Sequence, residues 1–204
     1  MSISQKINGA LRRVPVWPLY IIAIIPPAYL FYAGVTGQLG VDPVKKMEHE
    51  IGALGLKVLI AVIAITPLRN LTGISLIKFR RALGLIGFFY IVCHLLVWLV
   101  LDVQIVSQIL KDIYKRPYVT IGMAGLTAMI PLALTSNNWS LRKLGPKWRS
   151  LHKLTYLAVI LGGVHYVWLV KGWQVEPLVY LAVILGLLAM RMPGLKGVQV
   201  PGLR

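Results

Sequence analysis

All six acidic residues of this chain lie in alternate connections between long apolar stretches. The other connections and both ends of the chain carry only lysine and arginine as charged residues. The acidic residues are Asp42, Glu48, Glu50, Asp102, Asp112 and Glu176. Such a division is typical of a chain that crosses a membrane repeatedly, because cytoplasmic connections carry an excess of lysine and arginine. The charge pattern therefore predicts a polytopic membrane protein.

Six apolar stretches are long enough, or nearly so, to cross a hydrocarbon core, which takes about 20 helical residues. They lie near residues 17–34, 51–68, 82–101, 118–135, 154–170 and 177–190. The chain is 57% hydrophobic and 14% charged, which is more apolar surface than a soluble domain of 204 residues could bury. The expected fold class is all-α, a single bundle of six transmembrane helices that forms one domain over 1–204, and no internal repeat is visible.

The distribution of lysine and arginine also predicts the orientation. The positive-inside rule places both termini in the cytoplasm, which agrees with an even number of spans. The first stretch lacks a small-residue cleavage site, so we expect a retained span rather than a cleaved signal peptide. The net charge of +16 flanks the spans instead of forming a soluble basic face. We therefore expect membrane lipid, and no nucleic acid, as the partner of these charges.

Two histidines lie at nearly the same depth on different predicted helices. His94 and His165 lie roughly 20 Å and 18 Å above the basic boundary at 1.5 Å per residue. Ionisable side chains inside a bilayer are costly and mark functional sites. Two imidazoles at one level across a bundle can bind both axial positions of one haem iron, and without a C-x-x-C-H motif any such haem would be held without thioether bonds. The alternative is a pair of interhelical hydrogen-bonding histidines.

His152 lies at the basic end of the fifth predicted span, before His165. At about 100° per residue the two side chains of a straight helix would point well apart. The third span offers Arg80 and Arg81, not a histidine, where a second ligand would lie. Spacing therefore does not support a second bis-histidine haem. His152 is a candidate haem-associated residue with an unusual partner, or else an interfacial residue with an ordinary hydrogen bond.

His49 and Lys57 flank the start of the second predicted span. His49 lies between two glutamates and is a candidate proton acceptor from a quinol. Lys57 lies about 12 Å further along the helix and is a candidate contact for a quinone oxygen or a haem propionate. The alternatives are a plain interfacial histidine and a lysine that extends to the membrane surface.

Arg80 and Arg81 open the third predicted span on the basic side. A phosphate-bearing cofactor such as FMN, or a quinone, would suit this face. The alternative is that these arginines only fix topology and contact anionic lipid. Several glycines on the third and fifth spans either allow close helix packing or clear space for a flat cofactor. They are Gly84, Gly87, Gly162 and Gly163.

Several stretches together resemble one family. In chain order they are DPVKKMEHEIG, LKVLIAVIAITPL, FRRALGL, the lone His94, KRPYVTIG, RKLGPKWRSLHKLTYL and VHYVW. They resemble MsrQ, the haem-binding membrane subunit of the periplasmic methionine sulfoxide reductase system, within the ferric-reductase-like transmembrane group. The resemblance covers about 40–191. It aligns His94, His152 and His165 with the family's haem-associated histidines, and Arg80 and Arg81 with its basic pair.

The resemblance implies a function that composition does not show. Members of the family sit in the bacterial inner membrane and pass electrons from the quinone pool through b-type haem. The recipient is a periplasmic, molybdenum-containing catalytic subunit that reduces methionine sulfoxide in oxidised proteins, and family members are also associated with FMN. The chain would then be a redox subunit that supports protein repair, not the catalytic sulfoxide reductase itself. We expect the partner to dock near Glu48, 102–116 and 171–176.

Two other classes of protein fit part of the pattern. A small transporter or proton channel would use membrane histidines and a buried Lys57 as an ion path, although an inverted repeat and a midplane acid are missing. A non-catalytic membrane anchor for a partner enzyme would need none of the histidines.

Overall fold

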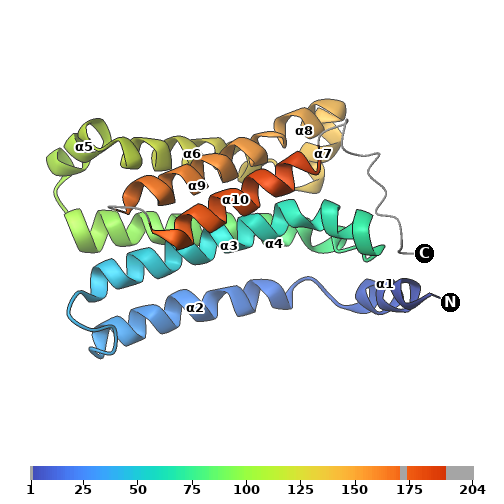
Figure 1. Ribbon diagram of the computed structural model, residues 1–204, viewed down its shortest axis with the longest axis horizontal. Coiled ribbons are helices and arrows are strands. Elements are labelled where there is room, and N and C mark those ends of the chain that lie inside the picture. Colours follow the sequence, from blue (N-terminus) through green and yellow to red (C-terminus); the bar gives the residue numbers. More distant parts are fainter. Residues whose placement is uncertain (1, 171–173, 192–204) are drawn as a thin grey trace.

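The computed structural model describes residues 2–170 and 174–191, and over these ranges the chain is helical and contains no strand. Figure 1 shows the long helices side by side in one bundle, with α5 at one end and α1, α7 and α8 at the other. The elements are α1 (Ile3–Arg13), α2 (Pro18–Val35), α3 (Pro43–Thr72), η1 (Ile77–Phe79), α4 (Arg80–Leu96), η2 (Val97–Val103), α5 (Val106–Lys115), α6 (Pro117–Leu134), α7 (Asn138–Leu144), α8 (Pro146–Leu151), α9 (Leu154–Leu169) and α10 (Val175–Ala189). The all-α fold class is confirmed.

Within residues 2–170 and 174–191, four helical segments are long and apolar enough to cross a membrane. They are α2, α3, the continuous segment Ile77–Val103 and α6. Helices α9 and α10 coincide with the fifth and sixth predicted spans, but they have only 16 and 15 residues, fewer than the about 20 of a full span. The membrane class is thus confirmed, whereas the count of six spans stays a prediction.

The acidic residues gather at one end of the bundle. Asp42 caps α3 by accepting a hydrogen bond from the backbone N–H of Lys45 at 3.1 Å. The remaining acids lie in the first turns of α3, in η2, in α5 and in the first turn of α10, which Figure 1 places at the same end. We call this the acidic end, and the end with α1, α7 and α8 the basic end. Of the predicted docking loop 171–176, residues 171–173 lie outside the described part of the chain.

Two helix pairs form the centre of the bundle. Helix α3 packs along α4, and α6 packs along α9. A Cβ atom added at Gly87 of α4 would lie 2.7 Å from Leu59 Cδ2, and one added at Gly163 of α9 would lie 2.9 Å from Ile184 Cδ1. These two glycines therefore allow close helix packing, which is the first of the two alternatives.

The buried core adjoins both helix pairs. Its central cluster consists of Leu56, Leu59, Ile63, Met129, Ala158, Val159 and Ile184. These side chains come from α3, α6, α9 and α10, so the core ties the α3–α4 pair to the α6–α9 pair. That connection fixes the position of the inner face of α4 relative to that of α9.

Candidate cofactor site

The structure brings the two predicted membrane histidines together. His94 lies on α4 and His165 on α9, both in the half of the bundle towards the acidic end. Their ring centroids are 6.2 Å apart and the ring planes are inclined by 78°. The prediction that imidazoles from separate helices meet at one level is confirmed, while their role as ligands stays a prediction.

Each imidazole is held by a backbone carbonyl of the neighbouring helix. His94 Nδ1 lies 2.9 Å from the carbonyl oxygen of Glu48, and His165 Nδ1 lies 2.7 Å from that of Tyr118. A carbonyl oxygen can only accept, so Nδ1 carries the proton and donates in both cases. In the neutral imidazole this leaves the lone pair on Nε2 available, which is the state a metal-ligating histidine needs.

A glycine lies under each ring. A Cβ atom added at Gly52 would lie 2.9 Å from His94 Nδ1, and one added at Gly122 would lie 2.9 Å from His165 Nδ1. Each glycine is four residues after the accepting carbonyl, so the ring reaches the carbonyl across the place where a side chain would begin. Any other residue would force the imidazole away from its hydrogen bond.

Sequence reasoning missed these two glycines. It considered only glycines on the helices that carry the histidines, whereas Gly52 and Gly122 lie on the neighbouring helices α3 and α6. A signal was present: the Ile-Gly pair recurs in EHEIG and YVTIG, three and four residues after Glu48 and Tyr118. The same local arrangement thus occurs twice, once in each helix pair, although the sequence shows no obvious repeat.

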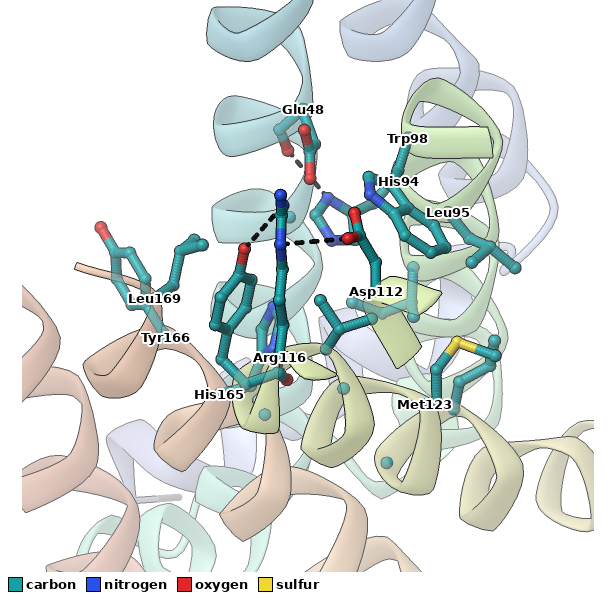
Figure 2. Close-up of a pocket in the computed structure, with 18 of the residues that line it drawn as sticks. Glu48, His94, Leu95, Trp98, Asp112, Arg116, Met123, His165, Tyr166 and Leu169 are labelled. Carbon is teal, nitrogen blue, oxygen red and sulfur yellow. Dashed lines mark hydrogen bonds and ion pairs between the residues drawn. The ribbon is translucent and has the colours of Figure 1, made fainter. Parts of the chain in front are cut away.

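A cavity of about 760 Å³ adjoins both imidazoles (Figure 2). Its inner part is apolar, and its mouth at the acidic end is lined by charged side chains of α3, η2 and α5. The apolar lining includes Leu56, Leu59, Leu126, Met129 and Ala158. The charged lining includes Lys45, Glu48, Asp102, Lys111, Asp112, Lys115 and Arg116. This is the usual composition of a cofactor pocket, apolar with a few polar groups that set orientation.

The two candidate site residues near the start of α3, His49 and Lys57, lie in different surroundings. His49 lines the mouth of this first cavity. Lys57 is exposed on the outside of the bundle and lines neither this cavity nor the second one described below. The buried Lys57 that a transporter would use is therefore absent from the structure.

The residues present fit a haem. With metal–nitrogen bonds of about 2 Å and the centre of each ring about 1 Å further out, two axial imidazoles on one iron have centroids about 6 Å apart. The observed separation agrees. Within the described residues, no three or more His, Cys, Asp or Glu side chains form a metal-binding group. A two-histidine site of this kind suits a metal whose other ligands come from a macrocycle.

A second cavity, of about 440 Å³, lies at the basic end. It brings together the predicted residues Arg80, Arg81 and His152. Other basic residues of its lining, which sequence reasoning did not single out as site residues, are Arg149, Lys153 and Arg191. The lining contains no acidic side chain, so the cavity suits an anionic ligand.

Two arginines of this cavity keep unused hydrogen-bond capacity. Arg80 donates to Thr66 Oγ1, and Arg191 donates to the carbonyl of Ile63 and to Tyr156 Oη. The Nε atoms of both arginines are buried and have no partner among the described residues. Buried unsatisfied donors are costly, and a phosphate or carboxylate in the cavity would satisfy them.

His152 is held differently from the paired histidines. It follows α8 directly and precedes α9, so the fifth span does not carry it. Its ring stacks on Trp148 at 3.8 Å, and its Nε2 hydrogen-bonds to Thr135 Oγ1 at 3.0 Å. Burial, and secondarily the charge of Arg81, holds the pKa of His152 below its usual range.

The two cavities adjoin each other. Leu59, Met129 and Ala158 line both of them. These apolar side chains of the core therefore separate the basic cavity from the cavity beside the paired histidines. The arrangement provides two neighbouring compartments, one at each end of the bundle.

The long apolar helices define a membrane-protein bundle, and its two-histidine cavity is a candidate cofactor site. Residues 51–163 match the family described as "Ferric reductase like transmembrane component". The chain is 49% identical over 177 residues to proteins of Brucella ovis, Brucella canis and Brucella melitensis biotype 2. These alignments cover 86% of this chain and 80% of each relative. No solved structure matches the chain.

Each of these relatives is called "Protein-methionine-sulfoxide reductase heme-binding subunit MsrQ". Both the family match and the extent of the identity agree with the motifs found in the sequence. The chain belongs to the MsrQ family.

The titration of His152 tests the basic cavity. We expect its imidazole to titrate with a midpoint below the about 6.5 of a free histidine, because burial and Arg81 oppose protonation. The folded-state pKa is lowered, so the contribution to stability is complete above the unfolded pKa and is lost as the pH falls through the folded pKa. Histidine-selective NMR in detergent measures the midpoint.

Arg81→Gln should move this midpoint partway up, whereas Arg142→Gln, at an exposed position of α7, should leave it unchanged. A wild-type midpoint at or above that of a free histidine would contradict the described surroundings of His152.

Proposed function

We propose that the chain is the electron-transfer subunit of a methionine sulfoxide reductase system and binds haem b between His94 and His165. The observation that carries the proposal is the pair of imidazoles, 6.2 Å apart, each held by a carbonyl so that its Nε2 is free to bind. The relatives' name, a heme-binding subunit, supports the same cofactor. Bound haem supplies a one-electron iron couple that amino-acid side chains lack.

The side chains around the histidines would prepare the site for electron transfer rather than catalysis. Imidazoles on both faces leave no open coordination position for oxygen. The carbonyls of Glu48 and Tyr118 fix both rings in the ligating tautomer and so limit reorganisation when the charge changes. The apolar inner lining excludes water and disfavours the additional charge of the oxidised state, which raises the reduction potential.

We further propose that six helices span a bacterial inner membrane with both termini in the cytoplasm. The division between acidic and basic ends supports this orientation through the positive-inside rule. The acidic end would then face the periplasm, and the paired histidines would lie closer to the outer leaflet. Helices α9 and α10 would cross with help from flanking residues, since short spans are tolerated through local thinning of the bilayer.

The electrons would come from the quinone pool. A quinol that is oxidised releases two electrons and two protons, and His49 at the mouth of the first cavity is the candidate proton acceptor. FMN is the candidate ligand of the second cavity, with its phosphate against Arg80 and Arg81. The shared lining of the cavities supports transfer between two such cofactors.

The recipient would be a periplasmic, molybdenum-containing catalytic subunit. It would dock on the acidic end near Glu48, 102–116 and 171–176. Reduction of a methionine sulfoxide consumes two electrons and two protons and yields a thioether and water. Because a haem carries one electron at a time, the membrane subunit would deliver two electrons in succession for each sulfoxide. Through this partner the chain supports the repair of oxidised periplasmic proteins.

The spectrum of the purified protein tests the cofactor. We expect sharp cytochrome b bands in the dithionite-reduced minus oxidised spectrum. His94→Ala and His165→Ala should each abolish them, because each removes an axial ligand, whereas His152→Ala should at most weaken them. Absence of the bands in wild-type protein expressed with haem supplied would favour a transporter or an anchor. Flavin analysis of the same sample tests the FMN proposal.

The glycines under the rings provide a subtler test. Gly52→Ala or Gly122→Ala should displace the imidazole and weaken haem retention about tenfold, because a lost buried hydrogen bond costs about 1–3 kcal/mol. Haem transfer to apomyoglobin measures the retention. Gly186→Ala on α10 is the matched control, since a Cβ atom at Gly186 meets nothing within 4 Å and Gly186 lines neither cavity. Equal retention in all three variants would contradict the proposed seating of the rings.

The orientation can be measured by cysteine labelling. In a Cys93→Ser background, Gln104→Cys at the acidic end should react with an impermeant maleimide in intact spheroplasts. Arg142→Cys at the basic end should react only after lysis. Both positions are exposed, so access differs only by the side of the membrane, and the reverse pattern would refute the orientation.

A further inference from the structure

The charged mouth of the first cavity has a defined centre. Four cationic side chains of the described residues line it, and of these Arg116 joins α5 to α6 directly beside the paired histidines. Figure 2 shows the Arg116 side chain running past His165 towards Glu48, with Asp112 beside it and His94 beyond. Arg116 precedes by two residues the carbonyl of Tyr118 that holds His165. Its guanidinium therefore borders the space next to the imidazoles.

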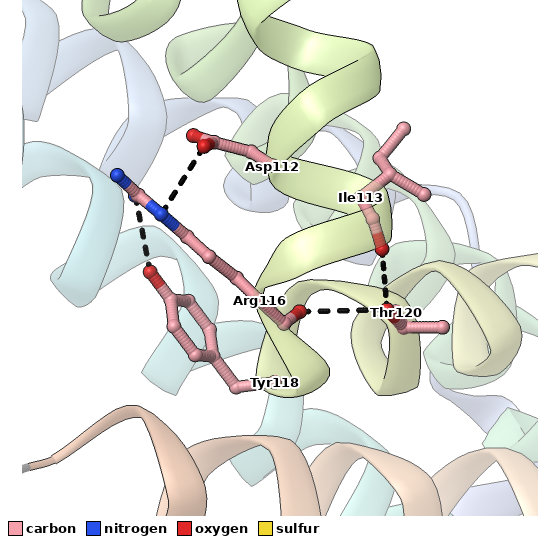
Figure 3. Close-up of polar contacts among 5 residues, drawn as sticks. All are labelled: Asp112, Ile113, Arg116, Tyr118 and Thr120. Carbon is pink, nitrogen blue, oxygen red and sulfur yellow. Dashed lines mark hydrogen bonds and ion pairs between the residues drawn. The ribbon is translucent and has the colours of Figure 1, made fainter.

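Two contacts hold the guanidinium, one on each side, and leave its remaining donors without a protein partner among the described residues. Arg116 Nε lies 3.1 Å from Asp112 Oδ1, and Arg116 Nη1 donates to Tyr118 Oη at 3.3 Å (Figure 3). A guanidinium has five N–H donors in a planar fork, so donors remain for another acceptor. The Asp112 side chain is only 15% exposed, whereas that of Arg116 is 52% exposed. Asp112 thus acts as an anchor, and Arg116 stays accessible from the cavity.

A hydrogen bond also holds the turn between α5 and α6. Thr120 Oγ1 donates to the carbonyl of Ile113 across the turn between α5 and α6. This bond and the Asp112–Arg116–Tyr118 contacts join the last turn of α5 to the first turn of α6 (Figure 3). The position of the guanidinium is therefore set before any ligand binds, which reduces the entropic cost of binding.

We propose that Arg116 binds a propionate carboxylate of the haem and so orients the macrocycle with its propionates towards the acidic end. The inference rests on the proposed haem between His94 and His165. The inner lining of the cavity is apolar, and an ionised carboxylate buried there without a partner would be costly. The mouth offers a preorganised arginine, and its lining contains Lys45, Lys111 and Lys115 as well as the acidic side chains Glu48, Asp102 and Asp112. An arginine fork matches a carboxylate with two parallel hydrogen bonds.

Haem and haem dimethyl ester, in which both propionates are esterified, test this contact. Apoprotein purified from haem-depleted cells is titrated with each compound in detergent, and the affinity ratio is measured. We expect wild-type protein to prefer haem by about tenfold or more, the size of a charge-assisted hydrogen bond. Arg116→Gln should reduce this preference about tenfold, while both compounds still give the spectrum of two axial imidazoles.

Two controls separate direct binding from other effects. Arg142→Gln removes an exposed arginine at the basic end and should keep the wild-type preference. Asp112→Asn combined with Arg116→Gln removes the ion pair as a unit, so no carboxylate is left bare to repel the propionates. If Arg116 binds a propionate directly, the double variant also lacks the preference.

Three results would overturn the proposal. They are equal affinity of wild-type protein for haem and its ester, an unchanged preference in Arg116→Gln, and recovery of the preference in the double variant. Equal affinity of the wild-type protein for the two compounds overturns the proposal even if Arg116→Gln does not fold. Failure of the haem proposal itself looks different, because neither compound would then give a low-spin bis-imidazole spectrum.

Discussion

The arrangement of this protein depends on the way two imidazoles are seated against neighbouring helices. Each ring lies over a glycine and donates its Nδ1 proton to the carbonyl four residues earlier. The carbonyl keeps its helical role, since an oxygen with two lone pairs can accept twice. Each contact requires a glycine, because a Cβ atom at that position would lie too close to the Nδ1 atom of the ring. From these two contacts follow the tautomer and the free Nε2 atoms.

Two helix pairs hold an imidazole in the same way, against a carbonyl and over a glycine. This repetition makes the site symmetric although the sequence shows no obvious repeat. In α3–α4 the seat comes from Glu48 and Gly52, and in α6–α9 it comes from Tyr118 and Gly122. Both seat helices start at the acidic end with a proline at their first position, where the missing N–H costs nothing. The core cluster then joins the pairs and sets the distance across the cavity.

The charge distribution gives the two ends of the bundle different chemistry. At the basic end, arginines surround a cavity with no acidic side chain in its lining. At the acidic end, acids and bases alternate around the mouth of the larger cavity, and Asp112 holds Arg116 in place. The apolar side chains of Leu59, Met129 and Ala158 lie between these compartments. Such an order suits electron transfer between two cofactors in neighbouring compartments.

The sequence by itself determined the helical membrane class, the segregation of acids from bases and the common level of His94 and His165, because each follows from local hydropathy, charge and the rise per residue of a helix. The motifs also identified the family. Only the tertiary structure decided that Gly52 and Gly122 seat the rings, that Lys57 lies outside both cavities and that His152 stacks on Trp148 outside α9. Those features depend on how each helix is rotated about its axis against its neighbours. That rotation is set by packing between residues distant in the chain, which no local pattern encodes.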